Sequence, residues 1–183
     1  MGVTMVRITV SGHPGSGTST LVNSLVERFG WSSLNGGDVF REEANRRAMS
    51  LADFGELCKQ ELDVDRSLDA LLKEKMVGDA PSDIVESRLA GWWAHKLGLD
   101  CVRLWLDVTD EERARRVAHR EGTTFEQALA ANRSRAAVDE ERFRLLYDLV
   151  PQDPTPYTVV LDATNLNATE ILEHVVAMLE DEQ

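Results

Sequence analysis

The 183-residue chain contains few lysines, and acidic residues dominate its charge. Sixteen of its 20 basic residues are arginines, and the lysines are Lys59, Lys73, Lys75 and Lys96. With 32 Asp and Glu residues the net charge is −12 at pH 7. A chain this acidic repels a phosphate backbone, which excludes a nucleic-acid binder that works through a broad basic face. A local basic pocket is still compatible with this charge.

Cysteine is also scarce, and long hydrophobic runs are absent. Cys58 and Cys101 lie far apart with no CxxC motif or Cys/His cluster, which argues against a zinc site and a disulfide framework. No apolar run approaches the ~18 residues of a membrane span, and the first ten residues lack the pattern of a secretory signal. We therefore expect a cytoplasmic protein with no membrane partner.

Short β-like runs alternate with longer helical patterns along the chain. Runs of β-branched and apolar residues predict strands at 6–10, 83–86, 101–106 and 157–161. Apolar spacing and capping residues predict helices at 21–29, 38–48, 64–76, 89–97, 124–147 and 168–179, and two more that begin after Ser50 and Thr109. This order predicts one domain, residues 1–183, with a three-layer α/β fold around a parallel sheet.

The strongest local motif is Gly12-His-Pro-Gly-Ser-Gly-Thr-Ser19, between the first predicted strand and the first predicted helix. It has the spacing of the phosphate-binding loop GxxxxGK[ST], with Thr18 in place of the lysine. Its backbone N–H groups can converge on a phosphate at a helix N-terminus, where the helix dipole favours an anion. The hydroxyl after the lysine position ligates Mg²⁺ in such loops, which makes Ser19 the candidate. A flexible Gly/Ser turn is the alternative, but the strand before and the helix after favour phosphate binding.

Without the lysine, another group must supply positive charge to the phosphates, and arginines can do so bidentately. Asp38 and Arg41 follow a Gly-Gly turn at a predicted helix start, and Glu86 and Arg88 lie at the carboxyl end of a predicted strand, where α/β proteins bind ligands. An aspartate cap with a solvated arginine, and a structural ion pair, are the alternative interpretations.

Arginines are concentrated in two of the predicted helices. They are Arg113, Arg115, Arg116, Arg120, Arg133, Arg135, Arg142 and Arg144. Arg113, Arg116 and Arg120 share one helix face by their spacing. This pattern is typical either of a solvated charged surface paired with nearby carboxylates, or of a two-helix lid that folds over polyphosphates.

Together these motifs resemble the archaeal-type cytidylate kinases, within the P-loop nucleoside monophosphate kinases, over nearly the whole chain. The matching segments are 6–20, Gly37–Arg41, Met49–Gly55, Asp63–Asp69, Glu86–Trp92, Arg116–Gly122 and Arg135–Arg142. Threonine at the lysine position occurs in archaeal-type members. The resemblance implies a P-loop kinase fold with a five-stranded parallel sheet, a helical part at 38–76 that binds the monophosphate, and arginine-rich helices at about 110–147 that include a lid.

The resemblance also implies the reaction, which is transfer of the γ-phosphoryl group of ATP to CMP or dCMP in the presence of Mg²⁺. We expect the protein to be a monomer. The residues implied for ATP are Gly12, His13, Pro14, Gly15, Ser16, Gly17, Thr18, Ser19 and Thr20. Those implied for CMP are Asp38, Arg41, Asp65, Arg88 and Asp139, and those for the transferring group are Arg116, Arg120, Arg135 and Arg142. Ser19 would bind the metal directly, and Asp38 and Glu86 through water. Asp162 to Thr164 would lie beside the adenine.

Two other functions remain open from the sequence. One is a kinase for another monophosphate, such as AMP or UMP, and the other is a P-loop ATPase or switch outside metabolism. A switch does not need the second phosphate site that Arg41 and Arg88 would form. The acidic, lysine-poor composition also fits a surface adapted to high salt, and a halophilic source is our hypothesis.

Overall fold

The computed structural model describes residues 5–181 of the chain. The strands are β1 (Ile8–Gly12), β2 (Ser33–Asn35), β3 (Ile84–Glu86), β4 (Val102–Asp107) and β5 (Val159–Asp162). The helices are α1 (Thr18–Phe29), α2 (Gly36–Arg46), α3 (Leu51–Gln60), α4 (Leu62–Val77), α5 (Ala90–Lys96), α6 (Asp110–Glu121), α7 (Phe125–Tyr147) and α8 (Ala168–Asp181).

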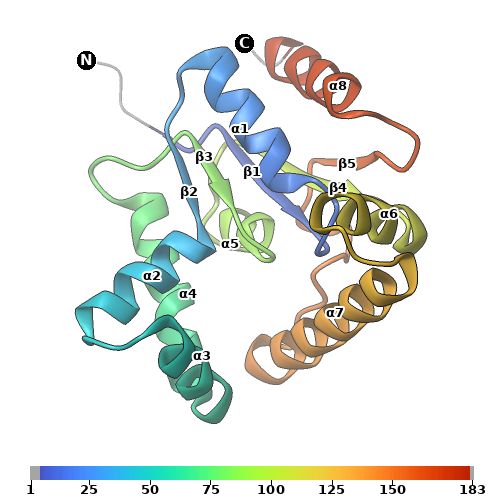
Figure 1. Ribbon diagram of the computed structural model, residues 1–183. Helices are drawn as coiled ribbons and strands as arrows, with labels where there is room; N and C mark the ends of the chain where they lie inside the picture. Colours follow the sequence, from blue (N-terminus) through green and yellow to red (C-terminus); the bar gives the residue numbers. More distant parts are fainter. Residues whose placement is uncertain (1–4, 182–183) are drawn as a thin grey trace.

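The five strands form one parallel sheet, as the P-loop kinase resemblance implies, and their order is β2-β3-β1-β4-β5 (Figure 1). The central strand β1 pairs Ile8 with Ile84 of β3 on one side and with Val102 of β4 on the other. The edge strand β2 was not predicted, because its three residues, Ser33-Leu34-Asn35, are too short and too polar to show a strand pattern.

The predicted helix starts are largely confirmed by their caps. Ser50 accepts a hydrogen bond from the backbone N–H of Asp53, and Thr109 caps α6 in the same way. Helix α2 begins at Gly36, two residues before the predicted start at Asp38. The helix starts earlier because Asn35 is its N-cap. Asp38 is the third helical residue, and its side chain accepts a hydrogen bond from the backbone N–H of Asn35, which completes a capping box.

Helices cover both faces of the sheet. Helices α1 and α8 pack on one face, where Leu25 and Val175 join Ile8 and Val10 in the main core cluster. On the other face α2, α4, α5 and α7 surround a second cluster that contains the fully buried Trp93. Together with the sheet, the two helical layers make the predicted three-layer architecture, and the carboxyl ends of all five strands point to one edge.

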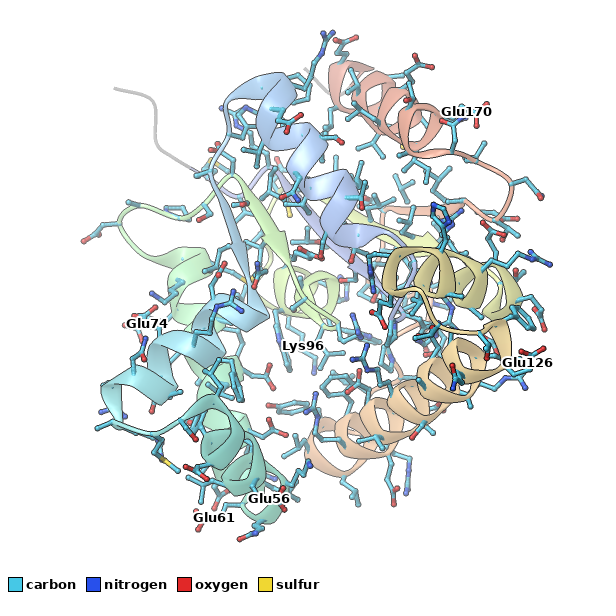
Figure 2. All side chains as sticks on the ribbon, in the orientation of Figure 1. Glu56, Glu61, Glu74, Lys96, Glu126 and Glu170 are labelled. Atoms are coloured by element: carbon cyan, nitrogen blue, oxygen red, sulfur yellow. The ribbon has the colours of Figure 1, made fainter. Side chains whose placement is uncertain are left out.

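Acidic side chains lie on the outside of this architecture. Figure 2 shows Glu56, Glu61, Glu74, Glu126 and Glu170 directed away from the molecule, and all five are exposed. Among the residues that the structure describes, no helix has the length and hydrophobicity that crossing a bilayer requires.

Candidate active site

The loop from Gly12 to Ser19 connects β1 to α1 at the carboxyl edge of the sheet. Gly15 and Gly17 adopt positive φ angles of 84° and 94°, which residues other than glycine rarely adopt. Gly17 is the N-cap of α1, and since it has no side chain it cannot cap the first turn of the helix. The first backbone N–H groups of α1 therefore remain available to an anion.

Three arginines from other parts of the chain hold the carbonyl oxygens of this loop. The bonds are Arg88 Nη1 to Gly12 (3.1 Å), Arg113 Nη1 to Pro14 (2.9 Å) and Arg116 Nη1 to Ser16 (3.0 Å). Every second carbonyl from Gly12 to Ser16 is thus bound to a guanidinium group. These contacts fix the orientation of the peptide groups and surround a loop that has no lysine with positive charge.

His13 lies in the loop with its ring edge-on to Trp105, at a centroid distance of 5.1 Å. Burial lowers the pKa of His13, and the nearby charges of Arg113 and Arg88 lower it further. A neutral imidazole suits this place, because an additional cation beside two guanidinium groups would be repelled.

Glu86 ends β3 beside the first turn of α1. Its Oε1 accepts hydrogen bonds from Thr18 Oγ1 at 2.7 Å and from Ser19 Oγ at 2.8 Å. Thr18 and Ser19 therefore both face the carboxylate, as a compact set of hydroxyl and carboxylate oxygens. Such hard oxygen ligands are those that Mg²⁺ prefers.

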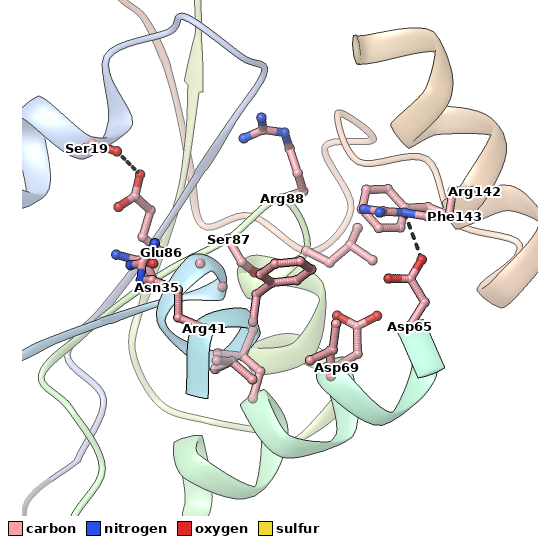
Figure 3. Close-up of a pocket in the computed structure, with 17 residues that line it drawn as sticks. Ser19, Asn35, Arg41, Asp65, Asp69, Glu86, Ser87, Arg88, Arg142 and Phe143 are labelled. Atoms are coloured by element: carbon pink, nitrogen blue, oxygen red, sulfur yellow. Dashed lines mark hydrogen bonds and ion pairs between the residues drawn. The ribbon is translucent and has the colours of Figure 1, made fainter. Parts of the chain in front are cut away.

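A cavity of about 520 Å³ opens next to this oxygen set (Figure 3). The polar residues that line it are Ser19, Asn35, Arg41, Asp65, Asp69, Glu86, Ser87, Arg88 and Arg142. Val39, Phe40, Leu68, Leu72 and Phe143 form much of the apolar remainder. We name it the acceptor cavity, because it is lined by Arg41 and Arg88, which the resemblance assigns to the monophosphate that accepts the phosphoryl group.

Three of the five residues predicted for CMP, Arg41, Asp65 and Arg88, line the acceptor cavity, whereas Asp38 and Asp139 do not. One carboxylate oxygen of Asp38 accepts from Arg41 Nη2 at 2.6 Å, and the other closes the capping box of α2. Asp38 therefore holds Arg41 and the start of α2. Its predicted role near the metal through water stays a prediction.

A chain of ion pairs links three residues that line the acceptor cavity, Arg88, Arg142 and Asp65, through Asp139. Arg88 Nε lies 3.1 Å from Asp139 Oδ2, Arg142 Nη2 lies 3.3 Å from Asp139 Oδ1, and Arg142 Nε lies 3.4 Å from Asp65 Oδ2. This chain joins the segment after β3 to α7 and α4. The charges of two arginines predicted to bind phosphate groups are thereby balanced by two carboxylates.

A second cavity, of about 450 Å³, is lined by Gly17 of the loop, and we name it the donor cavity because the segment after β5, which the resemblance places beside the adenine of ATP, also lines it. Gly17 and Thr20 line it from the start of α1, Arg116 lines it from α6, and residues 164–168 line it from the segment between β5 and α8. Arg116 Nη2 also donates to the carbonyl oxygens of Ala163, at 2.7 Å, and Leu166, at 3.2 Å. Arg116 thus ties the segment after β5, which the resemblance places beside the adenine, to the phosphate-binding loop.

The other two predicted lid arginines are not brought into either cavity. Arg120 is exposed and pairs with the neighbouring Glu121 at 2.8 Å. Arg135 is exposed on α7, one turn before Asp139. Their predicted roles in transfer stay predictions, which would require α6 and α7 to close over bound nucleotides.

Sequence reasoning missed two residues of the site. Arg113 was noted only as part of a charged helix face, yet it is 2% exposed and reaches Pro14. Asp69 was noted only as the last residue of a family motif, yet it lines the acceptor cavity and accepts a 2.5 Å hydrogen bond from Tyr147 Oη. The acidic spacing of Asp65 and Asp69 on one helix face was the available signal for the second.

Residues 11–141 match the AAA_17 family model, described as an AAA domain. The chain is 36% identical to the cytidylate kinase of Methanocorpusculum labreanum, covering 94% of this chain and 95% of that protein. It is 35% identical to the cytidylate kinase of Halobacterium salinarum, covering 92% and 86%. The solved structure of the shikimate kinase from Acinetobacter baumannii shares the fold, with a TM-score of 0.63 and 13% identity, covering 99% of this chain and 96% of that one. The chain belongs to the family of archaeal cytidylate kinases, within the P-loop kinases of the AAA_17 model.

Proposed function

We propose that the protein transfers the γ-phosphoryl group of ATP to CMP or dCMP, giving ADP and CDP or dCDP. The observation that carries the proposal is the pair of cavities that meet at one phosphate-binding loop. Ser19 and Glu86 mark the acceptor side, and Gly17 and Arg116 mark the donor side. Two nucleotides bound there would have their phosphates adjacent, which is the arrangement that direct transfer needs.

In this mechanism the acceptor phosphate is itself the nucleophile, so no dedicated general base is required. Arg41 and Arg88 hold that phosphate, and the amide groups of the loop hold those of ATP. Arg116 adds charge on the donor side. Positioning and charge stabilisation together lower the barrier as charge develops on the transferring group.

The oxygen set of Thr18, Ser19 and Glu86 fits Mg²⁺, and we propose that Ser19 and Glu86 hold it there, Ser19 directly and Glu86 through water. Within residues 5–181 no group of three or more His, Cys, Asp or Glu side chains forms a metal cage. This suits an ion held jointly by the protein and by ATP phosphates. When bound, Mg²⁺ would neutralise charge on the phosphate oxygens.

We further propose that α6 and α7 form the lid and that the monomer is the active unit. Closing the lid would exclude water, which otherwise would hydrolyse ATP. The monomer is supported by the fact that residues of one chain line both cavities. Gel filtration of the active protein tests this part, and activity found only in a dimer would contradict it.

The experiment that tests the function is an acceptor panel. ADP formation is measured with CMP, dCMP, UMP and AMP, each with and without Mg²⁺. We expect the highest kcat/KM with CMP or dCMP and loss of turnover without Mg²⁺. Preference for AMP or UMP would favour a kinase for another monophosphate, and ATP hydrolysis unaffected by any acceptor would favour a P-loop ATPase or switch.

A further inference from the structure

The acceptor cavity has two chemically different ends. Ser19, Glu86 and Arg88 lie on the side of the phosphate-binding loop, whereas Asp65 and Asp69 of α4 lie across the cavity from Ser19 and Glu86 (Figure 3). This inference rests on the proposed function. For a monophosphate to accept a phosphoryl group, its phosphate must lie next to the loop, and its base must therefore reach toward α4.

The wall between the two ends suits a flat aromatic ring. Val39 and Phe40 of α2, Leu68 and Leu72 of α4, and Phe143 of α7 line it. Apolar side chains favour the faces of a nucleobase but cannot recognise the donors and acceptors on its edge. Discrimination between bases must therefore come from the polar groups at the α4 end.

Asp65 and Asp69 differ in the partners of their carboxylate groups. Asp65 forms an ion pair with Arg142, which in turn pairs with Asp139. Asp69 forms no salt bridge among the described residues, and its Oδ2 accepts a hydrogen bond from the neutral hydroxyl of Tyr147. Tyr147 packs edge-on against the buried Trp93, at a centroid distance of 4.9 Å, so the hydroxyl that orients Asp69 is itself held in place.

We propose that Asp69 is the residue that selects the base, by accepting a hydrogen bond from the exocyclic amine of cytosine. In its ionised form Asp69 only accepts hydrogen bonds, so it then fits the 4-amino group of cytosine and repels the 4-oxo group of uracil. A buried site made for one hydrogen-bond partner rejects an analogue that lacks it by a large factor, because its polar group is then left unpaired.

The test is Asp69→Asn, compared with Asp65→Asn one turn earlier on the same helix. Asparagine has the same shape and can still accept from Tyr147, but its amide can also donate to a 4-oxo group. For Asp69→Asn we expect the CMP-to-UMP ratio of kcat/KM to fall at least ~10-fold. For Asp65→Asn we expect weaker use of both substrates and a ratio within about threefold of the original, since its charge serves Arg142.

Dissociation constants for CMP and UMP, measured by calorimetry, should show the same change of ratio without any turnover. If Asp69→Asn melts far below the parent protein, Asp69→Ser provides a smaller replacement with the same expected loss of discrimination. An unchanged ratio in a folded Asp69 variant would overturn the inference and leave the proposed function intact. A parent protein that binds CMP tightly but does not phosphorylate it would instead refute the proposed function, while the binding ratio would still test Asp69.

Discussion

The side chain of Arg113 is almost completely buried, and it donates through Nη1 to the carbonyl oxygen of Pro14 at 2.9 Å. Its Nε donates to the carbonyl of Val108 at 3.2 Å, and its Nη2 pairs with Asp110. One residue thus joins the phosphate-binding loop to the end of β4 and the start of α6.

Replacing Arg113 with methionine should therefore weaken both the fold and ATP binding. Two buried carbonyl oxygens would lose their partner, which we expect to cost about 3 kcal/mol, or roughly 6–12 °C in Tm. The KM for ATP should rise about tenfold with the KM for CMP unchanged, because only the loop is released. The control is Arg115→Met, an exposed position on the same helix. Equal Tm and KM values in the two variants would contradict this role.

Arg135→Ala tests the lid. Arg135 is exposed on α7, so its removal should leave Tm within about 1 °C of the parent protein, as expected for surface substitutions. If the arginine reaches the transferring group when the lid closes, kcat should fall at least ~100-fold, the typical cost of losing one transition-state donor. Steady-state kinetics beside Arg144→Ala, a second exposed arginine of α7, measures this. Parent-like kcat in both variants would remove Arg135 from the mechanism.

Thr18→Lys tests whether arginines take the place of the missing lysine in binding ATP at the loop. A lysine at this position would meet Glu86, which now accepts from Thr18 Oγ1 at 2.7 Å. We expect a folded, active protein whose KM for ATP changes less than about threefold, since three guanidinium groups already surround the loop. An ATP affinity that rises ~100-fold would mean that those groups do not replace the lysine.

Glu43 makes stability depend on acid pH. Hydrogen bonds from Arg46 and Arg47 lower its pKa from 4.5 to about 2. A carboxyl with a lowered pKa in the folded state stabilises the fold above pH 4.5, and this contribution disappears as the pH falls toward 2. The difference in Tm between the parent protein and Glu43→Gln should therefore be largest at pH 5 to 7 and shrink by pH 3. A difference that stays constant with pH would show that the ionised form is not responsible.

The surplus of surface carboxylates predicts a dependence on salt. With a net charge of −12, self-repulsion destabilises the folded chain at low ionic strength and is screened when salt is added. We expect Tm and activity to rise between 0.05 M and multimolar KCl. Values that are the same across this range would refute the halophilic hypothesis.

Much of the fold could be predicted because its elements have strong local patterns. The glycine loop between β1 and α1, the β-branched strands and the capping residues Ser50 and Thr109 all act within a few residues of sequence. Strand β2 could not be found, since three residues with one apolar side chain take their extended form from pairing with β3. Here tertiary contacts, not local preference, determine the structure.

Many residues of the site could be predicted from the sequence, but the ion pairs and hydrogen bonds between them could not. Their position after a predicted strand placed Glu86 and Arg88 at the edge where α/β proteins bind ligands, but it could not show that Arg88 is paired with Asp139 or that Asp38 closes a capping box with Asn35. Charged side chains can pair with residues of elements that are distant in sequence. Asp69, for example, accepts a hydrogen bond from Tyr147, which lies 78 positions later in the chain. Such contacts depend on packing and leave no local pattern.

The central claim is that the loop serves two nucleotides at once, and ADP formation with and without CMP tests it most directly. With saturating ATP and Mg²⁺, adding CMP should increase the rate of ADP formation by several orders of magnitude, with one CDP formed for each ADP. ADP formation at the same rate in the absence of CMP, or without matching CDP, would contradict the account.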